Sequence, residues 1–154
     1  MRSLITIFAS TVLLSLAATC AEADPAANTQ TARRVFLEKM GEGRFDKLDQ
    51  IYGPGFVAHG SSRDYTLEED NESGKAWRAA FPDLKVSVER TVADDEFVAV
   101  HWSAAGTNTA AAAGTPGLGK KARVEGMTFF RFADGRIIEE WSIIDLAALN
   151  QQLM

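Results

Sequence analysis

The spacing of the hydrophobic residues changes about halfway along this chain of 154 residues. Between residues 31 and 81 the apolar side chains recur every three or four positions, as on one face of a helix. From residue 84 to residue 144 apolar and polar residues mostly alternate, as in strands with one buried face. Helices followed by antiparallel strands predict an α+β domain, with the N-terminal helices packed on one face of a curved antiparallel sheet.

The helical half contains three predicted helices. The first covers residues 31–40, and the second, shorter one covers residues 45–52, where the glycines and the proline that follow would end it. The third covers residues 66–81 and opens with Thr66 and Glu69, which have the spacing of a capping box. Its apolar face needs a hydrophobic partner, which the strands can supply.

The strongest local signal in the strand half is the pair Asp134-Gly135, which is typical of a tight β-hairpin turn. It separates two long strand-forming runs, residues 120–133 and 136–144. Two further strands are predicted between residues 84 and 105, and leucines at helical spacing predict a closing helix over residues 146–153.

Residues 1–23 have the pattern of a secretory signal peptide. An apolar run covers residues 4–18, and Ala21-Glu22-Ala23 is an A-x-A cleavage site. The run is too short to span a membrane. We therefore expect an exported protein, periplasmic or secreted, with no membrane attachment after cleavage. In this interpretation residues 24–30 are a loose polar leader, and residues 31–154 form the domain.

Cys20 is the only cysteine, and it lies within the expected signal peptide. The mature chain would then have neither a thiol nor a disulfide, which suits an oxidising compartment. It could use neither a cysteine nucleophile nor a cysteine-rich metal site. The alternative is that Cys20 accepts a lipid and anchors the protein, although Thr19 is an unfavourable residue directly before such a cysteine.

Composition and charge limit the kinds of partner that we expect the protein to bind. Hydrophobic residues make up 46% of the chain, enough for a core, and the formal net charge is −5. A nucleic-acid partner would require a basic face, so none is expected. Both faces of the strands carry large apolar residues, while the helices can cover only one face. This predicts a homodimer through the outer face of the sheet.

Three residues are candidates for acid/base catalysis. His59 follows an apolar segment at a loop edge, where a histidine can exchange protons near neutral pH. Asp145 ends an apolar run, where a carboxylate can have a raised pKa, and His101 lies in the middle of a strand beside Trp102. Each has a structural alternative: a loop histidine, a core or interface histidine, and an N-cap for the closing helix.

Large aromatic rings are numerous for a domain of this size. They predict an apolar pocket between the helices and the concave face of the sheet, with ordinary core packing as the alternative for each ring. Glu139 and Glu140 are neighbours on one strand, so only one of them can point into that pocket. The rings are Tyr52, Trp77, Phe81, Trp102, Phe129, Phe130 and Trp141.

Several short motifs follow one another along the chain. They are His59-Gly60, Phe81-Pro82-Asp83-Leu84, Val98-Ala99-Val100-His101-Trp102, Gly106-Thr107, Thr115-Pro116-Gly117, the run from Phe130 to Trp141, Asp145, and Gln151-Gln152-Leu153. Together they resemble the SnoaL-like polyketide cyclase (ester cyclase) family of the NTF2-like, ketosteroid-isomerase-like superfold, from about residue 31 to the end. The resemblance implies a cone-shaped α+β fold, often dimeric, without a metal ion or an organic cofactor.

The resemblance also implies aldol ring closure, with an aspartate as acid/base and a nearby histidine. This chain has Asn108 where many relatives have the histidine, and Thr128 where many cyclases have the acid. One hypothesis is a cofactor-free enzyme that acts beside the carbonyl of a small lipophilic compound, with His59 and Asp145 as the acid/base pair. Asn108 or Thr128 would hold the carbonyl oxygen. The other hypothesis is a non-catalytic binding protein for a small hydrophobic ligand.

Cleavage of the signal peptide gives a direct test. The A-x-A motif predicts that the mature protein begins at Asp24, and N-terminal sequencing of the exported protein should return that residue. Ala23→Asp should block cleavage, because the site requires a small residue there. A chain that still begins at Met1, or a lipid on Cys20, would contradict the prediction.

Overall fold

The structure, a computed structural model, describes residues 24–154. The expected signal peptide and Cys20 lie outside these residues. The elements in chain order are α1 (Pro25–Arg34), η1 (Val35–Glu42), η2 (Leu48–Gln50), β1 (Tyr52–His59), β2 (Asp64–Tyr65), α2 (Leu67–Ala80), β3 (Lys85–Ala93), β4 (Phe97–Asn108), β5 (Lys120–Ala133), β6 (Arg136–Ile144) and α3 (Leu146–Leu153). Among the helices of residues 24–154, none is long and apolar enough to cross a membrane.

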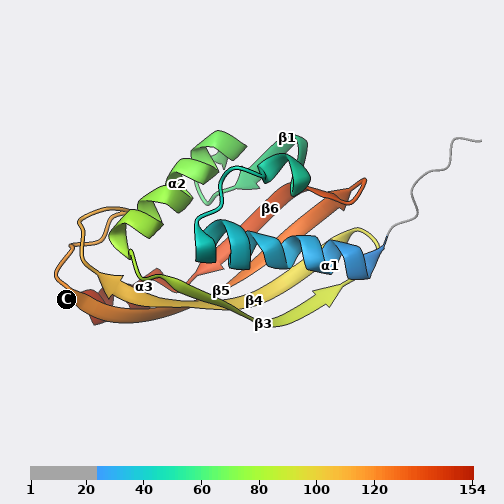
Figure 1. Cartoon of the computed structure of the whole chain (residues 1–154). Coiled ribbons are helices and arrows are strands. Elements are labelled where there is room, and N and C mark those ends of the chain that lie inside the picture. Colours follow the sequence, from blue (N-terminus) through green and yellow to red (C-terminus); the bar gives the residue numbers. More distant parts are fainter. Residues whose placement is uncertain (1–23) are drawn as a thin grey trace, which may run out of the picture.

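The six strands form one open sheet in the order β2-β1-β6-β5-β4-β3. Neighbouring strands are antiparallel except β1 and β6, which run parallel. Helices α1 and α2 lie across the same face of this sheet, as Figure 1 shows. The arrangement confirms the expected α+β, NTF2-like fold, and the parallel pair makes the sheet mixed rather than purely antiparallel.

The first helix begins earlier than the sequence pattern predicted. Oδ1 of Asp24 accepts hydrogen bonds from the backbone N–H groups of Ala26 and Ala27, and Pro25 occupies the first turn. An acidic N-cap followed by proline is a strong start signal for a helix. Residues 24–30 are therefore the first turns of α1 and not a loose leader. Their polar composition reflects a largely exposed helix rather than an absence of structure.

The predicted second helix is wrong. Only Leu48–Gln50 forms a short 3-10 turn, and Tyr52 already belongs to β1. In the sheet Tyr52 lies beside Ile137 of β6, and the N–H of Ile137 donates to the carbonyl oxygen of Ile51 at 2.9 Å. Pairing with β6 therefore overrides the helical spacing of the apolar residues in this stretch.

The remaining elements lie close to their predicted positions. α2 begins with the reciprocal hydrogen bonds of Thr66 and Glu69 that define a capping box. Asp134 and Gly135 connect β5 to β6 with φ values of 51° and 70°. Two consecutive residues with positive φ are what a tight hairpin turn requires.

The core lies between the helices and the inward-facing residues of the central strands. Trp102 of β4 pairs in register with Gly126 of β5. A Cβ atom on Gly126 would lie 2.4 Å from the indole of Trp102, so only glycine lets the ring approach β5 this closely. The ring stacks on Phe36 of η1, with 5.6 Å between the ring centroids. This contact joins the first helical segment to the middle of the sheet.

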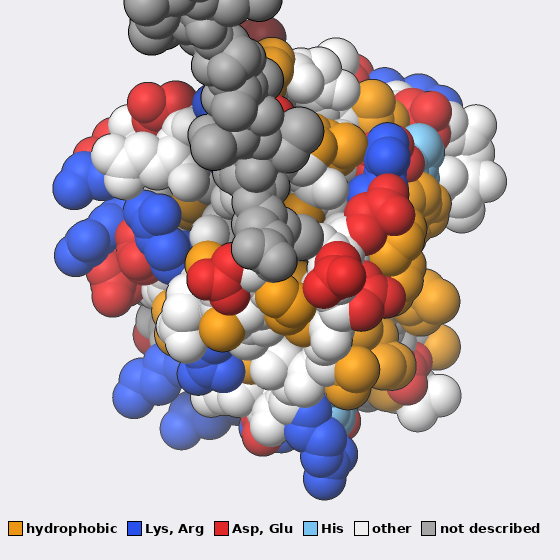
Figure 2. Space-filling view, turned by 90° about the vertical axis from the view of Figure 1, so that its right-hand side faces the viewer, with side chains coloured by type: hydrophobic (Ala, Val, Ile, Leu, Met, Phe, Trp, Pro, Cys, Tyr) orange, Lys and Arg blue, Asp and Glu red, His pale blue; other side chains and the backbone are white. Residues whose placement is uncertain are grey.

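The outer face of the sheet carries exposed hydrophobic residues. Val92, Met127 and Ile143 have 74%, 59% and 78% of their surface exposed. Phe129 lies partly exposed on the same face and stacks on Phe97. In the space-filling view of Figure 2, hydrophobic side chains gather along one side of the molecule beside acidic groups. An exposed apolar face of this size is unusual for a surface that meets only water.

Candidate functional site

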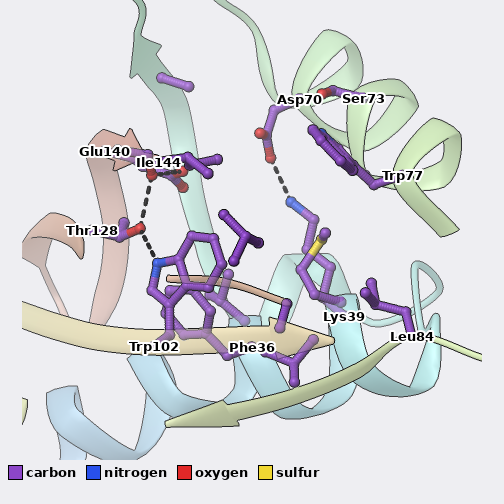
Figure 3. A pocket seen from close by; sticks show the side chains of 18 of the residues that line it. Phe36, Lys39, Asp70, Ser73, Trp77, Leu84, Trp102, Thr128, Glu140 and Ile144 are labelled. Carbon is purple, nitrogen blue, oxygen red and sulfur yellow. Dashed lines mark hydrogen bonds and ion pairs between the residues drawn. The ribbon is translucent and has the colours of Figure 1, made fainter. Parts of the chain in front are cut away.

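A cavity of about 450 Å³ lies between the inner face of the sheet, η1 and α2 (Figure 3). This volume is in the range of pockets that bind small molecules. Within residues 24–154, no group of three or more His, Cys, Asp or Glu side chains is placed to hold a metal ion. The larger apolar residues of the cavity wall are Val35, Phe36, Trp77, Phe81, Leu84, Val86, Trp102, Val124, Ile144 and Leu149.

Lys39 is a buried charged side chain in the cavity wall, with 2% of its surface exposed. It belongs to η1, a π-helical continuation of α1 that ends where Gly43 adopts a φ of 73°. Nζ of Lys39 donates to Oδ2 of Asp70 at 2.5 Å and to Oη of Tyr52 at 3.0 Å. These partners make the burial of the ammonium group possible, because an unpaired buried charge is strongly destabilising. Short π-helical segments are frequent at functional sites.

Tyr52 supports Lys39 from the core and is not part of the cavity wall. Burial, together with the negative charges of Glu140 and Asp70, raises the pKa of Tyr52 well above its usual value. The phenol therefore stays protonated, and its oxygen accepts the hydrogen bond from Lys39. The ring packs edge-on against Phe56, with 4.7 Å between centroids. The expectation that Tyr52 lines the pocket is therefore wrong.

Glu140 of β6 is the group in the cavity best suited to proton transfer. Its Oε1 accepts a hydrogen bond from Oγ of Ser142 at 3.0 Å, while its Oε2 is buried and has no hydrogen-bond partner among the described residues. Burial, reinforced by the negative charge of Asp70, raises the pKa of Glu140 to about 7. Lys39 and the bond from Ser142 limit the rise. Such a carboxyl group can both take up and release a proton at neutral pH.

A chain of hydrogen bonds connects Glu140 to the core. Nε1 of Trp102 donates to Oγ1 of Thr128 at 3.0 Å, and this hydroxyl lies 2.8 Å from Oγ of Ser142. Thr128 and Ser142 lie directly opposite each other on β5 and β6. Figure 3 shows Thr128 and Glu140 on one side of the cavity, with the ion pair of Lys39 and Asp70 on the opposite side.

His59 lies at the rim of the cavity, at the end of β1. Its Nδ1 is 2.9 Å from Oδ1 of Asp64, and its Nε2 is 3.2 Å from Oε2 of Glu139. The ring stacks on Trp141, with 4.5 Å between centroids. Burial would lower the pKa of His59, but the hydrogen bonds with Asp64 and Glu139 outweigh it and raise the pKa. Both ring nitrogens are engaged with carboxylates that lie outside the cavity wall, so His59 borders the cavity without pairing with Glu140.

His101 and Asp145 do not line the cavity. Both border a shallow depression on the outer face of the sheet. Nε2 of His101 lies 3.2 Å from a carboxylate oxygen of Glu125, and Asp145 caps α3 by accepting the N–H of Ala148 at 2.9 Å. Alternation along β4 turns Trp102 inward and His101 outward. The three predicted catalytic residues therefore do not form one site. The N-cap alternative is confirmed for Asp145, whereas His101 lies partly exposed on the outer face and is not a core residue.

The aromatic residues predicted for the pocket divide between the cavity, the core and the outer face. Phe130 is fully buried in the core, 6.0 Å from the ring of Phe36. Phe129 and Trp141 lie on the outer face and contact each other there, with 6.2 Å between centroids. The prediction was wrong for Phe129 and Trp141 because adjacent strand residues face opposite sides of the sheet. It was wrong for Phe130 because this ring faces inward but packs in the core and not in the cavity wall. The predicted residues that do line the cavity are Trp77, Phe81, Trp102 and Thr128.

Asn108 holds the loop between β4 and β5 and is not part of the cavity. Its Nδ2 donates to the carbonyl oxygens of Ala80 and Ala110, both at 3.2 Å, and to Oγ1 of Thr115 at 2.8 Å. Its Oδ1 accepts the N–H of Gly117 at 2.7 Å. The side chain is fully buried and bonded on both its nitrogen and its oxygen. The expectation that Asn108 holds a substrate carbonyl is therefore wrong.

Lys39, Asp70 and Glu140 were not among the residues predicted from sequence. A signal existed for Lys39, which falls on the apolar face of the first helix between Phe36 and Met40. For Glu140, alternation indicated that one glutamate of β6 points inward, but only the pairing with β5 decides which one. Asp70 gave no signal, because an acidic residue in the first turn of a helix is common.

The fold is a cone-shaped α+β fold with a cavity between its helices and the inner face of its sheet. The model of the family described as SnoaL-like polyketide cyclase matches residues 30–153 of this chain. The chain therefore belongs to the SnoaL-like polyketide cyclase family. Among proteins with curated functions, none matches this sequence.

Solved structures of other proteins share this fold. TsrD from Streptomyces laurentii has a TM-score of 0.77 and 21% identity, over 86% of this chain and 98% of its own. A candidate SnoaL-like polyketide cyclase from Jannaschia sp. CCS1 has a TM-score of 0.73 and 25% identity. The match covers 84% of this chain and 92% of that protein. AclR from Streptomyces galilaeus, a candidate hydroxylase, has a TM-score of 0.76 and 18% identity. The match covers 84% of this chain and 97% of AclR. The shared fold alone does not fix the reaction.

Glu139 and Glu140 should respond to pH in opposite ways. Folding disfavours the ionised form of Glu140, because its pKa rises from 4.5 to about 7. This cost to stability is absent below the unfolded pKa and becomes complete above the folded one. Glu140→Gln removes the cost. The variant should therefore exceed the wild type in stability by on the order of 3 kcal/mol at about pH 8, and by little at about pH 4.

Glu139→Gln is the matched control on the other side of the strand. The hydrogen bond from Arg131, followed by that from His59, lowers the pKa of Glu139. Its charge therefore stabilises the fold at neutral pH, and this contribution is lost as the pH falls through the lowered pKa. The variant should be less stable than the wild type near neutral pH, with a difference that shrinks in acid. Urea unfolding across this pH range checks both variants, and a loss of stability in Glu140→Gln at about pH 8 would contradict the desolvation of Glu140.

Proposed function

We propose that the protein is an acid/base enzyme of the isomerase or cyclase type that acts beside the carbonyl group of a small hydrophobic molecule. One observation carries the proposal: in a mostly apolar cavity, Glu140 has a pKa of about 7 and an oxygen without a hydrogen-bond partner among residues 24–154. Removing a hydrogen from a carbon next to a carbonyl needs a base and a group that stabilises the enolate. Glu140 and Lys39 can supply these two functions. Membership of the SnoaL-like family supports this class of reaction, and we expect no cofactor.

In this mechanism Oε2 of Glu140 takes the proton from the carbon, and the electron pair moves onto the carbonyl oxygen. The ammonium group of Lys39 has three N–H donors and uses two of them, on Tyr52 and Asp70. The third can donate to the enolate oxygen. Glu140 then returns the proton to a different carbon, which completes an isomerisation. Alternatively, the enolate carbon attacks a second carbonyl and Glu140 protonates the resulting alkoxide, which closes a ring.

These roles differ from those expected from the sequence. Asp145 is an N-cap on the outer side of the sheet, so it cannot act with His59 as an acid/base pair in the cavity. His59 remains a rim residue that can influence entry of a ligand. The hydroxyl of Thr128 is already bonded within the cavity wall, so Lys39 is the better donor for the carbonyl oxygen.

The cavity walls favour a flat hydrophobic substrate. Phe36 and Trp102 are stacked with 29° between their ring planes, and Trp77 and Phe81 are stacked with 22°. Aromatic walls of this kind bind ring systems through stacked and edge contacts. We therefore propose a substrate with a ring-bearing hydrophobic body and a carbonyl that reaches Glu140.

A non-catalytic binding protein for a small hydrophobic ligand is the second candidate. The ion pair favours it, since Asp70 neutralises Lys39 at 2.5 Å and weakens the attraction of the ammonium group for a ligand oxygen. The cavity would then hold its ligand mainly through apolar contacts. Glu140 would affect affinity in that case, and chemistry would not depend on it.

We also propose that the protein acts after export, in the periplasm or outside the cell. The A-x-A motif ends directly before Asp24, which is the N-cap of α1. Cleavage at this position would leave the first helix with its cap intact. Lipid attachment at Cys20 stays the alternative, and sequencing of the mature N-terminus separates the two.

The proton-transfer step can be tested before the substrate is known. 2-Tetralone, a bicyclic ketone with acidic hydrogens beside its carbonyl, serves as the probe. In D₂O near neutral pD the wild type should accelerate exchange of these hydrogens for deuterium, followed by proton NMR. Glu140→Gln should lower the protein-dependent rate by about 100-fold or more. Glu139→Gln should retain most of it, because Glu139 lies outside the cavity wall.

Binding of the probe is measured in parallel by quenching of tryptophan fluorescence. Equal exchange rates in the wild type and in Glu140→Gln would contradict the proposed mechanism. Tight binding without any accelerated exchange would favour the binding protein over the enzyme.

The homodimer through the outer face of the sheet is a further proposal, supported by the exposure of that face. Light scattering at micromolar concentration should give twice the mass of the chain. Ile143→Asp should shift the protein to monomers, because it would bury an unpaired charge in the interface. Leu118→Asp, in the loop between β4 and β5, is the control, since Leu118 and Ile143 are 62% and 78% exposed. A monomeric wild type would contradict the proposal.

A further inference from the structure

Three neighbouring strands contribute to one chain of hydrogen bonds that ends on Glu140 (Figure 3). Nε1 of Trp102 on β4 lies 3.0 Å from Oγ1 of Thr128 on β5. That oxygen lies 2.8 Å from Oγ of Ser142 on β6, which lies 3.0 Å from Oε1 of Glu140. All three links are within hydrogen-bonding distance. The chain runs across the sheet, so it is held by the pairing of the strands.

The direction of the chain follows from its two ends. An indole N–H can only donate, so Oγ1 of Thr128 accepts from Trp102, and an ionised carboxylate can only accept, so Ser142 gives its proton to Oε1 of Glu140. With the proton of Ser142 used in this way, Thr128 gives its own proton to Ser142. In this order each hydroxyl both accepts and donates, and no proton of the chain is left without an acceptor.

The two carboxyl oxygens of Glu140 consequently have different surroundings. Oε1 accepts the hydrogen bond from Ser142. Oε2 is buried and has no hydrogen-bond partner among residues 24–154. A buried oxygen without a partner destabilises the free protein, and a bound molecule that offers a hydrogen to it removes that cost. A proton on Oε1 would compete with the proton of Ser142, whereas Oε2 has no such competitor.

We propose that Thr128 and Ser142 are positioning residues that hold Oε1 of Glu140 and leave Oε2 as the oxygen that exchanges protons with a bound molecule. This inference rests on the proposed function, because it takes Glu140 as the acid/base group. The two hydroxyls act through Glu140 in two ways. They prevent the carboxyl group from rotating, and they stabilise its ionised form.

Other ionisable groups also act on Glu140. Asp70 from α2 and Lys39 from η1 do so through their charges, and the charge of Glu140 in turn acts on Tyr52 of β1. Among the described residues, none of these three side chains is hydrogen-bonded to the hydroxyl of Thr128 or of Ser142. Removing a hydroxyl therefore changes the chain and leaves those partners in place.

The titration of Glu140 measures the effect of the hydroxyls directly. Glutamate labelled with ¹³C at its carboxyl carbon gives one NMR signal per residue, and the signal missing in Glu140→Gln identifies Glu140. Ser142→Ala removes the donor to Oε1, so the ionised form loses a hydrogen bond and the titration midpoint should rise by about one pH unit. Thr128→Val keeps the shape of the side chain and should raise the midpoint by less, because Ser142 then loses its fixed orientation.

The conservative variants provide the matched controls. Ser142→Thr and Thr128→Ser keep the hydroxyl and should leave the midpoint within about 0.3 pH units of the wild type. The pH profile of deuterium exchange in 2-tetralone should move with the NMR midpoint in each variant. Circular dichroism checks that each variant is folded. If the variants of only one position, 128 or 142, are folded, they are sufficient to test the positioning role.

The outcomes separate this inference from the function on which it rests. A midpoint near 7 that is the same in the wild type, Ser142→Ala and Thr128→Val would overturn the positioning role and leave the proposed function standing. An equal shift in the conservative variants would also overturn it, because the hydroxyl would then not be the cause. A wild-type Glu140 that titrates near the ordinary value of 4.5 would instead remove the basis of the proposed function.

Discussion

The register of β5 against its two neighbours is the constraint on which the cavity depends. Side chains alternate between the faces of a sheet, so a slip of one residue would exchange the inner and outer residues of a whole strand. In the observed register Trp102 pairs with Gly126, and Thr128 pairs with Ser142. The first pair is locked by sterics, since a side chain at position 126 would meet the indole. The same register therefore places both the ring of Trp102 and the hydroxyls of Thr128 and Ser142 on the cavity side of the sheet.

Lys39, Asp70 and Glu140 are ionisable groups of a cavity wall whose larger residues are mostly apolar. Lys39 and Asp70 form an ion pair, so their opposite charges largely compensate each other. Among residues 24–154 no basic side chain forms an ion pair with Glu140, and burial makes Glu140 keep its proton to a higher pH. Electrostatic interactions are strong where water is excluded, so a second negative charge is disfavoured there. The charges of Asp70 and Lys39 thus help to set the pKa of Glu140.

Much of the fold was predictable because its signals are local. The Thr66–Glu69 capping box and the Asp134-Gly135 turn depend on residues a few positions apart, and both gave the right elements. The parallel pairing of β1 with β6 depends on residues about eighty positions apart, so the local spacing of apolar residues up to Tyr52 predicts a helix that the structure does not contain. The site was harder to predict for the same reason. Alternation indicated that one glutamate of β6 faces inward, but long-range pairing selects Glu140.

The loop between β4 and β5 takes its shape from Asn108 and from backbone groups. Residues 110–113 are four consecutive alanines, whose side chains make no hydrogen bonds. Ala112 packs against the small cluster that contains Phe81, and the ring of Phe81 lines the cavity. A larger residue in place of Ala112 would press on one end of the cavity while Asn108 kept the loop in place. The loop is therefore a position from which the shape of the cavity could be changed without rebuilding the sheet.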